Sequence, residues 1–70
     1  MKEVADYPKE GQFVVVWEYG KKIWSGAFKW KKGILYEYVG QKDKFCEQTS
    51  PSEYVWGHKD FKNKKFLVIG

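Results

Sequence analysis

The sequence predicts a small β-rich domain built around a three-stranded antiparallel meander. Between Gly11 and Val39, three runs rich in β-branched and aromatic residues are separated by Gly20 and Gly33, each of which lies beside lysines. Such residues favour pleated strands, and a glycine among polar residues is typical of the turn between two antiparallel strands. At 70 residues the chain is expected to form a single domain, residues 1–70.

Large side chains are the expected source of stability. A domain of this size buries only about 60% of its unfolded surface, and the chain has five phenylalanines, five tyrosines and four tryptophans to fill a small core. The single cysteine, Cys46, forms no intramolecular disulfide. Together with the single His58 it supplies too few ligands for zinc without several carboxylates. We therefore expect neither a metal nor a cofactor.

The first turn sets the register of the meander. A two-residue type II′ turn at Gly20-Lys21 brings Trp17 opposite Trp24 and Phe13 opposite Phe28. Cross-strand aromatic pairs of this kind stabilise a hairpin. The strands of the meander are expected at residues 12–19, 22–31 and 34–39.

The second turn is expected to have three residues, 31–33, which places Trp30 opposite Ile34. Because alternate side chains of a strand point to opposite faces, this register predicts one bulky aromatic face and one slimmer aliphatic face. The aromatic face would carry Phe13, Val15, Trp17, Tyr19, Trp24, Phe28, Trp30, Ile34, Tyr36 and Tyr38. The aliphatic face would carry Val14, Val16, Ile23, Ala27, Leu35 and Val39, together with Glu18, Ser25, Lys29 and Glu37.

Outside the meander the sequence predicts a polar arm over residues 1–10 and a polar loop over 40–49. Ser50-Pro51-Ser52-Glu53 has the pattern of a helix capping box, so a short helical turn is expected over about 51–58. A closing strand is expected over about 65–69. These elements predict an SH3-like small barrel, with an open α+β sheet as the alternative.

Two segments resemble known small β folds. Pro51-Ser52-Glu53-Tyr54-Val55 resembles the Pro-Ser-Asn-Tyr-Val segment of eukaryotic SH3 domains, which forms a 3₁₀ turn before the last strand. The resemblance implies that Pro51 and Tyr54 line a groove for proline-rich peptides, with Trp24 as the groove tryptophan. The acidic RT loop, the Ala-Leu-Tyr-Asp-Tyr opening and the Trp-Trp pair of that family are absent. The sequence pattern of residues 11–39 is also similar to that of Tudor- and KOW-like small barrels.

The residues that carry catalysis are scarce. Cys46 and His58 are the only pair that could form a nucleophile and base. The flanking residues match no catalytic cysteine motif, and no phosphate-binding loop, dinucleotide fingerprint or metal motif is present. We therefore expect a protein that is not an enzyme.

Charge and aromatic content favour a binding role. The chain has thirteen lysines, no arginine and nine acidic residues, which gives a net charge of +4. Lysine attracts anions but lacks the fork with which arginine reads bases. We predict a non-catalytic module that docks on a protein partner, as an inhibitor or adaptor of the kind phages encode. Single-stranded nucleic-acid binding by lysines and stacking aromatics is the alternative. The predicted binding residues are Tyr19, Trp30, Lys31, Lys32, Tyr36 and Tyr38.

The chain shows no sign of a membrane location. No apolar run reaches the roughly 18 residues that cross a bilayer, and the first residues do not resemble a signal peptide. The expected location is the cytoplasm, where an unpaired Cys46 stays reduced.

Overall fold

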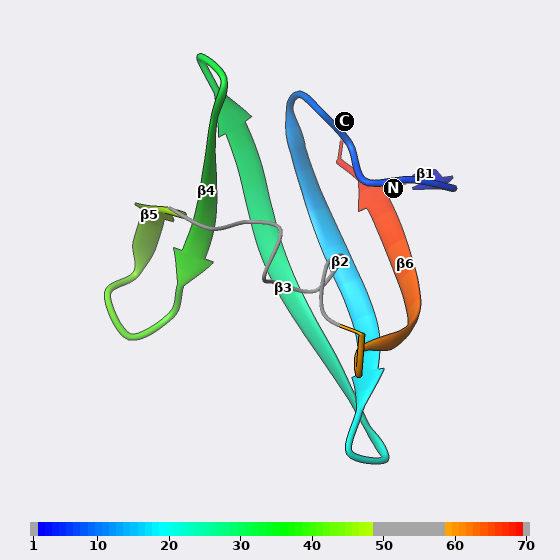
Figure 1. The fold of residues 1–70 in the computed structure, drawn as a ribbon. Coiled ribbons are helices and arrows are strands. Elements are labelled where there is room, and N and C mark those ends of the chain that lie inside the picture. The colour runs from blue at the N-terminus through cyan, green and yellow to red at the C-terminus, as the bar shows by residue number, and fades with distance from the viewer. Residues whose placement is uncertain (1, 49–58, 70) are drawn as a thin grey trace.

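A computed structural model describes residues 2–48 and 59–69. These residues form one six-stranded sheet in which every neighbouring pair is antiparallel, and they contain no helix (Figure 1). The described part of the chain accordingly has no helix long and apolar enough to cross a membrane. The strands are β1 (Lys2–Val4), β2 (Gln12–Tyr19), β3 (Lys22–Lys31), β4 (Ile34–Val39), β5 (Lys44–Glu47) and β6 (Lys62–Val68).

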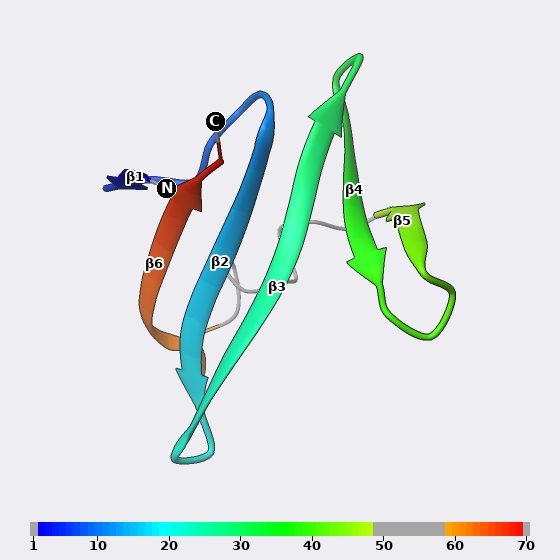
Figure 2. The same ribbon diagram turned by 180° about the vertical axis from the view of Figure 1, so that it is seen from behind.

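The strands follow the order β1-β6-β2-β3-β4-β5 across the sheet. The predicted closing strand, here β6, therefore pairs with β2, and β1 and β5 form the two edges. The sheet is strongly twisted, and the β2–β3 hairpin extends beyond the other strands at one end (Figures 1 and 2). The β-rich fold is confirmed, whereas the sheet is open over the described strands, so a closed barrel is not confirmed.

The three strands of the meander have the predicted bounds, and the first register is confirmed. Trp17 lies opposite Trp24, as expected. The turn differs in type, because Gly20 and Lys21 have φ angles of 60° and 64°. Positive φ at both central residues defines a type I′ turn rather than type II′. Both types place the same residues opposite each other, so the correction leaves the faces of β2 and β3 unchanged.

The predicted register of the second hairpin is wrong by one residue. Lys31 lies opposite Ile34, so the turn contains only two residues, Lys32 and Gly33, whose φ angles are 53° and 78°. This again fits a type I′ turn, for which glycine at the second position is favourable. A shift of one residue exchanges the two faces of a strand. In β4, Leu35, Glu37 and Val39 therefore take the positions predicted for Ile34, Tyr36 and Tyr38.

One face of the sheet, called the core face here, carries the buried side chains. Phe13 and Phe28 stack with ring centroids 5.6 Å apart and planes 17° apart. Gly26 leaves room for this arrangement, since a Cβ there would lie 3.1 Å from the Phe28 ring. The buried residues of the core face are Phe13, Val15, Phe28, Leu35 and Phe66, and the partly buried Val4, Tyr7, Trp17, Trp30 and Phe61 pack against them.

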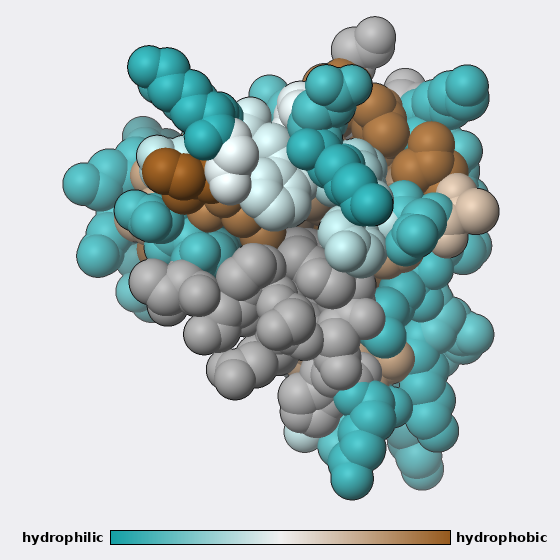
Figure 3. All heavy atoms as spheres, turned by 45° about the horizontal axis from the view of Figure 1, so that its top comes forward, coloured by the Kyte–Doolittle hydropathy of each residue, from teal (hydrophilic) through white to brown (hydrophobic). Residues whose placement is uncertain are grey.

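The opposite face, called the outer face, is only partly covered. Val14, Val16 and Ala27 are half-buried there, and Ile23 is 74% exposed. In the view of Figure 3, hydrophilic side chains project around much of the rim, and hydrophobic atoms lie between them. The predicted aliphatic character of this face is confirmed for β2 and β3 and wrong for β4.

Three further predictions are refined. The arm contains β1, which pairs with β6, and the polar loop contains β5, which pairs with β4. The closing strand begins at Lys62, earlier than expected, and ends at Val68. The predicted helical turn over 51–58 lies outside the described residues, as does the segment that resembles SH3 domains.

Candidate functional site

The end of the β2–β3 hairpin carries an exposed group of aromatic side chains on the core face. Its members line a hollow of about 330 Å³ and are named the aromatic cluster here: Trp17, Tyr19, Trp24 and Phe61. Tyr19 is 47% exposed and Trp24 46% exposed. Because the hairpin extends beyond the neighbouring strands, the alternation that buries Phe13 and Val15 places Trp17 at the margin of the core and Tyr19 beyond it.

A β-bulge brings Phe61 to the cluster. Between Val16 and Glu18 the register of β2 against β6 shifts, and β6 contains one extra residue. Asn63 lies within this extra length with a φ of 52°, a left-handed conformation that asparagine adopts more readily than most residues. The strand therefore bends, as is usual at a bulge. Phe61, directly before the strand, stacks on Trp17 at a centroid distance of 5.6 Å.

The aromatic cluster is held by defined contacts. Phe61 also meets Tyr19 edge-on, with centroids 5.2 Å apart and planes 77° apart. The indole Nε1–H of Trp24 donates a hydrogen bond of 3.1 Å to the backbone carbonyl oxygen of Tyr19. These contacts fix the ring of Trp24 relative to the hairpin and leave much of its apolar surface exposed. The cluster therefore presents ordered aromatic surface to solvent.

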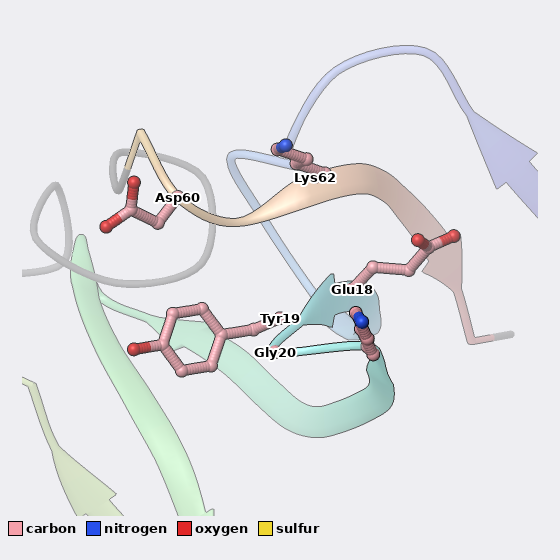
Figure 4. A pocket seen from close by; sticks show the side chains of 6 residues that line it. Glu18, Tyr19, Gly20, Asp60 and Lys62 are labelled. Atoms are coloured by element: carbon pink, nitrogen blue, oxygen red, sulfur yellow. The ribbon is translucent and has the colours of Figure 1, made fainter.

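A second hollow, of about 340 Å³, adjoins the aromatic cluster and shares Tyr19 with it. We call it the charged hollow. Its other lining residues are Glu18, Gly20, Lys21, Asp60 and Lys62 (Figure 4). The Tyr19 ring and the Glu18 carboxylate project in opposite directions from the end of β2, as alternate residues of a strand must (Figure 4). A Glu18 carboxylate oxygen accepts a hydrogen bond of 2.9 Å from the Asn63 side-chain amide.

The six predicted binding residues do not lie together. Tyr19 belongs to the aromatic cluster. Trp30 is half-buried, and its Nε1–H donates a hydrogen bond of 2.7 Å to the carbonyl oxygen of Pro8, so it ties the arm to the core face. Lys31 and Lys32 lie at the β3–β4 turn, at the other end of β3, roughly 23 Å from Trp24 at the usual rise per residue.

The predicted residues of β4 lie on the outer face. Tyr36 is half-buried and Tyr38 is exposed there. The Tyr38 hydroxyl donates a hydrogen bond to the Asp43 carboxylate, which raises the pKa of the tyrosine. Its ring meets Phe45 edge-on at 5.6 Å, and the Lys29 ammonium lies 4.3 Å from the Phe45 centroid. These contacts form a small cluster of their own, separate from Tyr19.

Glu37 is a half-buried acid on the core face, a position that the sequence-based register assigned to Tyr36. Burial raises the pKa of its carboxyl above the ordinary value of 4.5. The Gln48 side-chain amide donates a hydrogen bond of 3.1 Å to one carboxylate oxygen. Although Gln48 donates this hydrogen bond, the carboxylate is desolvated, which makes its ionised form unfavourable in the fold.

We expect Glu37→Gln to stabilise the fold at neutral pH. The folded pKa is raised, so the folded state binds the proton more tightly than the unfolded state does. The wild-type free energy of unfolding therefore rises as pH falls through the folded pKa toward 4.5. The amide removes this dependence while keeping an oxygen for Gln48. Urea denaturation should show the variant more stable at neutral pH, with the difference shrinking in acid.

The matched control is Glu47→Gln on the adjacent strand β5, where the carboxylate is exposed. It removes the same charge and should leave the free energy of unfolding nearly unchanged at neutral pH. A Glu37→Gln protein that is less stable than wild type at neutral pH would contradict this account of the buried carboxylate.

The described residues show no arrangement for metal chemistry. No group of three or more His, Cys, Asp or Glu side chains in them could hold a metal ion. Cys46 is half-buried and opposite Glu37, and His58, the base considered for a pair with it, lies outside the described residues.

Comparison of the chain with family models, with curated proteins and with solved structures finds no match in any of the three. Sequence reasoning placed Trp17, Trp24 and Tyr19 together on one face but named only Tyr19 as a binding residue. The sequence feature that indicated Trp17 and Trp24 was their pairing next to a turn, because the end of a hairpin has the fewest neighbouring strands to cover it. The sequence did not place Phe61 beside Trp17 and Tyr19.

Proposed function

We propose that this chain is a non-catalytic binding module that docks on a protein partner through the aromatic cluster. The observation that carries the proposal is the exposure of Tyr19 and Trp24, each nearly half exposed beside the same hollow. Tryptophan and tyrosine are enriched among the residues that dominate protein–protein affinity. An aromatic ring that is already held in place loses little conformational entropy on binding.

The proposal includes the roles predicted from the sequence. A small lysine-rich chain with exposed aromatic side chains is consistent with an inhibitor or adaptor of a phage type that acts in the cytoplasm. The finer assignment of an SH3-like barrel, with its helical turn over 51–58, stays a prediction. The proposed binding surface is the end of the β2–β3 hairpin and not the set of six residues predicted from the sequence. Tyr19 belongs to both.

We expect Trp24→Ala to abolish partner capture while the chain stays folded. Removing a central aromatic from an interface costs at least about 2 kcal/mol, roughly 30-fold in affinity. Trp24 lies outside the buried core, so the fold should survive. The measurement is retention of proteins from a nuclease-treated cell lysate on the immobilised chain, with circular dichroism to verify folding.

The control is Ile23→Ala, which changes the adjacent residue of β3 on the opposite face. Ile23 is 74% exposed, so its loss removes apolar surface without touching the aromatic cluster. This variant should capture the same proteins as wild type. If folded Trp24→Ala retains them equally well, the aromatic cluster is not the docking surface.

A further inference from the structure

We propose that the aromatic cluster and the charged hollow act as one two-part site for an acidic protein segment. In this arrangement an apolar or aromatic side chain of the partner rests on Tyr19 and Trp24. A neighbouring Asp or Glu of the same segment pairs with Lys21 and Lys62. The inference rests on the proposed function and adds to it the chemistry of the partner.

Continuity of the two hollows is the first argument. Tyr19 lines both, so a single extended segment that touches its ring reaches each hollow without leaving the surface. Side chains of an extended segment alternate in direction at intervals of about 3.3 Å. An apolar residue and an acid at nearby positions can therefore enter the two hollows together.

Charge is the second argument. Lys21, Lys22 and Lys62 are exposed at the end of the hairpin and on the neighbouring start of β6. Of the two acids in the charged hollow, Glu18 already accepts the hydrogen bond from Asn63, and Asp60 has an interaction of its own in the structure. Lys21 and Lys62 equal the two acids of the charged hollow in number, and the exposed Lys22 beside it gives the hairpin end one positive charge in excess. A carboxylate from a partner complements this excess.

The same hollow argues against nucleic acid. A single strand needs a continuous positive groove along which its phosphates run. Here two carboxylates, Glu18 and Asp60, share the hollow with the lysines, and each would repel a passing phosphate. A peptide with one acidic residue needs only one position beside Lys21 or Lys62, whereas a nucleic-acid strand carries a negative charge on every nucleotide. The observations therefore favour an acidic peptide segment over a polynucleotide.

The test begins with selection from a random linear peptide display library on the intact chain. Enriched peptides should combine Trp, Phe or Leu with an Asp or Glu within a few positions. A synthetic peptide of the enriched sequence then serves as the probe for affinity measurements. The Lys21→Glu, Lys62→Glu double variant should bind it about tenfold more weakly, because two opposite-charge pairs become like-charge pairs.

The matched control is the Lys42→Glu, Lys44→Glu double variant. Both lysines are exposed near the β4–β5 turn, so the net charge changes equally at a place outside the two hollows. Its affinity for the peptide should stay within about twofold of wild type, the range expected from long-range charge alone. Equal weakening by both double variants would show only a general effect of charge and would overturn the inference.

The outcomes separate the inference from the proposed function. If Trp24→Ala abolishes peptide binding but the Lys21, Lys62 variant binds normally, the docking function stands and the acidic preference is wrong. If Trp24→Ala binds the peptide as wild type does, the aromatic cluster is not the docking site and both fail. Both also fail if oligodeoxythymidylate displaces the peptide and its own binding weakens steeply with salt, the mark of a phosphate-binding surface.

Discussion

Phe28→Ala is expected to remove about half of the chain's free energy of unfolding. Phe28 is fully buried and stacks on Phe13 at the centre of the core face. Truncating a buried phenylalanine to alanine costs about 3–5 kcal/mol. A 70-residue domain at 0.05–0.15 kcal/mol per residue has only about 4–10 kcal/mol in total. The variant should therefore unfold at a urea concentration far below the wild-type midpoint, as followed by circular dichroism.

Ile23→Ala provides the comparison within the same strand. Ile23 is five residues from Phe28 and on the opposite face, so it should change the free energy of unfolding by no more than about 0.5 kcal/mol. If Phe28→Ala retains a cooperative urea transition at the wild-type midpoint, the stacked phenylalanines are not the centre of stability. The pair also separates loss of a core contact from loss of apolar area in general.

The first hairpin could be predicted from sequence because its turn and its side-chain pattern agree. Gly20 lies between two runs whose aromatic residues fall only at alternate positions, and a two-residue turn of either primed type pairs Trp17 with Trp24. The bulky and slim positions on the two sides of the turn then match across the hairpin. The turn type was predicted incorrectly, but this error has no effect on the register.

The second hairpin could not be settled in this way. Lys31, Lys32 and Gly33 are compatible with a two-residue or a three-residue turn, and both types accept glycine at the last position. The following strand, Ile34–Val39, has large apolar or aromatic residues at odd and even positions alike. Its pattern therefore gives no preference between the two registers. In the structure the two-residue turn is formed, which buries Leu35 and exposes Ile34.

The edge strands and the bulge depend on partners distant in sequence. Strand β1 has three residues and β5 has four, and each contributes few apolar side chains of its own. Their strand conformation comes from pairing with β6 and β4, which a local pattern does not reveal. The position of Phe61 against Trp17 depends on the bulge at Asn63 in the same way. This is why sequence reasoning found the tryptophan pair and missed the full aromatic cluster.

The observed register of β4 leads to a second prediction with a large expected effect, because it exchanges which of two adjacent aliphatic side chains is buried. Leu35 is 2% exposed within the core, whereas Ile34 is 39% exposed beside the turn. Leu35→Ala should lower the free energy of unfolding by about 2–5 kcal/mol, since it opens a cavity among buried side chains. Ile34→Ala should lower it by less than about 1 kcal/mol, because the lost methyl groups were already partly solvated.

Urea titrations of both variants, followed by tryptophan fluorescence, measure this difference directly. Each substitution removes three carbon atoms from a neighbouring position of the same strand. The higher strand propensity of isoleucine would by itself make Ile34→Ala the more costly change, so the expected order comes from burial. A three-residue turn at 31–33 would place Ile34 against Trp30 on the core face and Leu35 outside, and it would reverse the order of the two effects. A larger loss of stability for Ile34→Ala than for Leu35→Ala would therefore show that β4 pairs one residue out of the register described here.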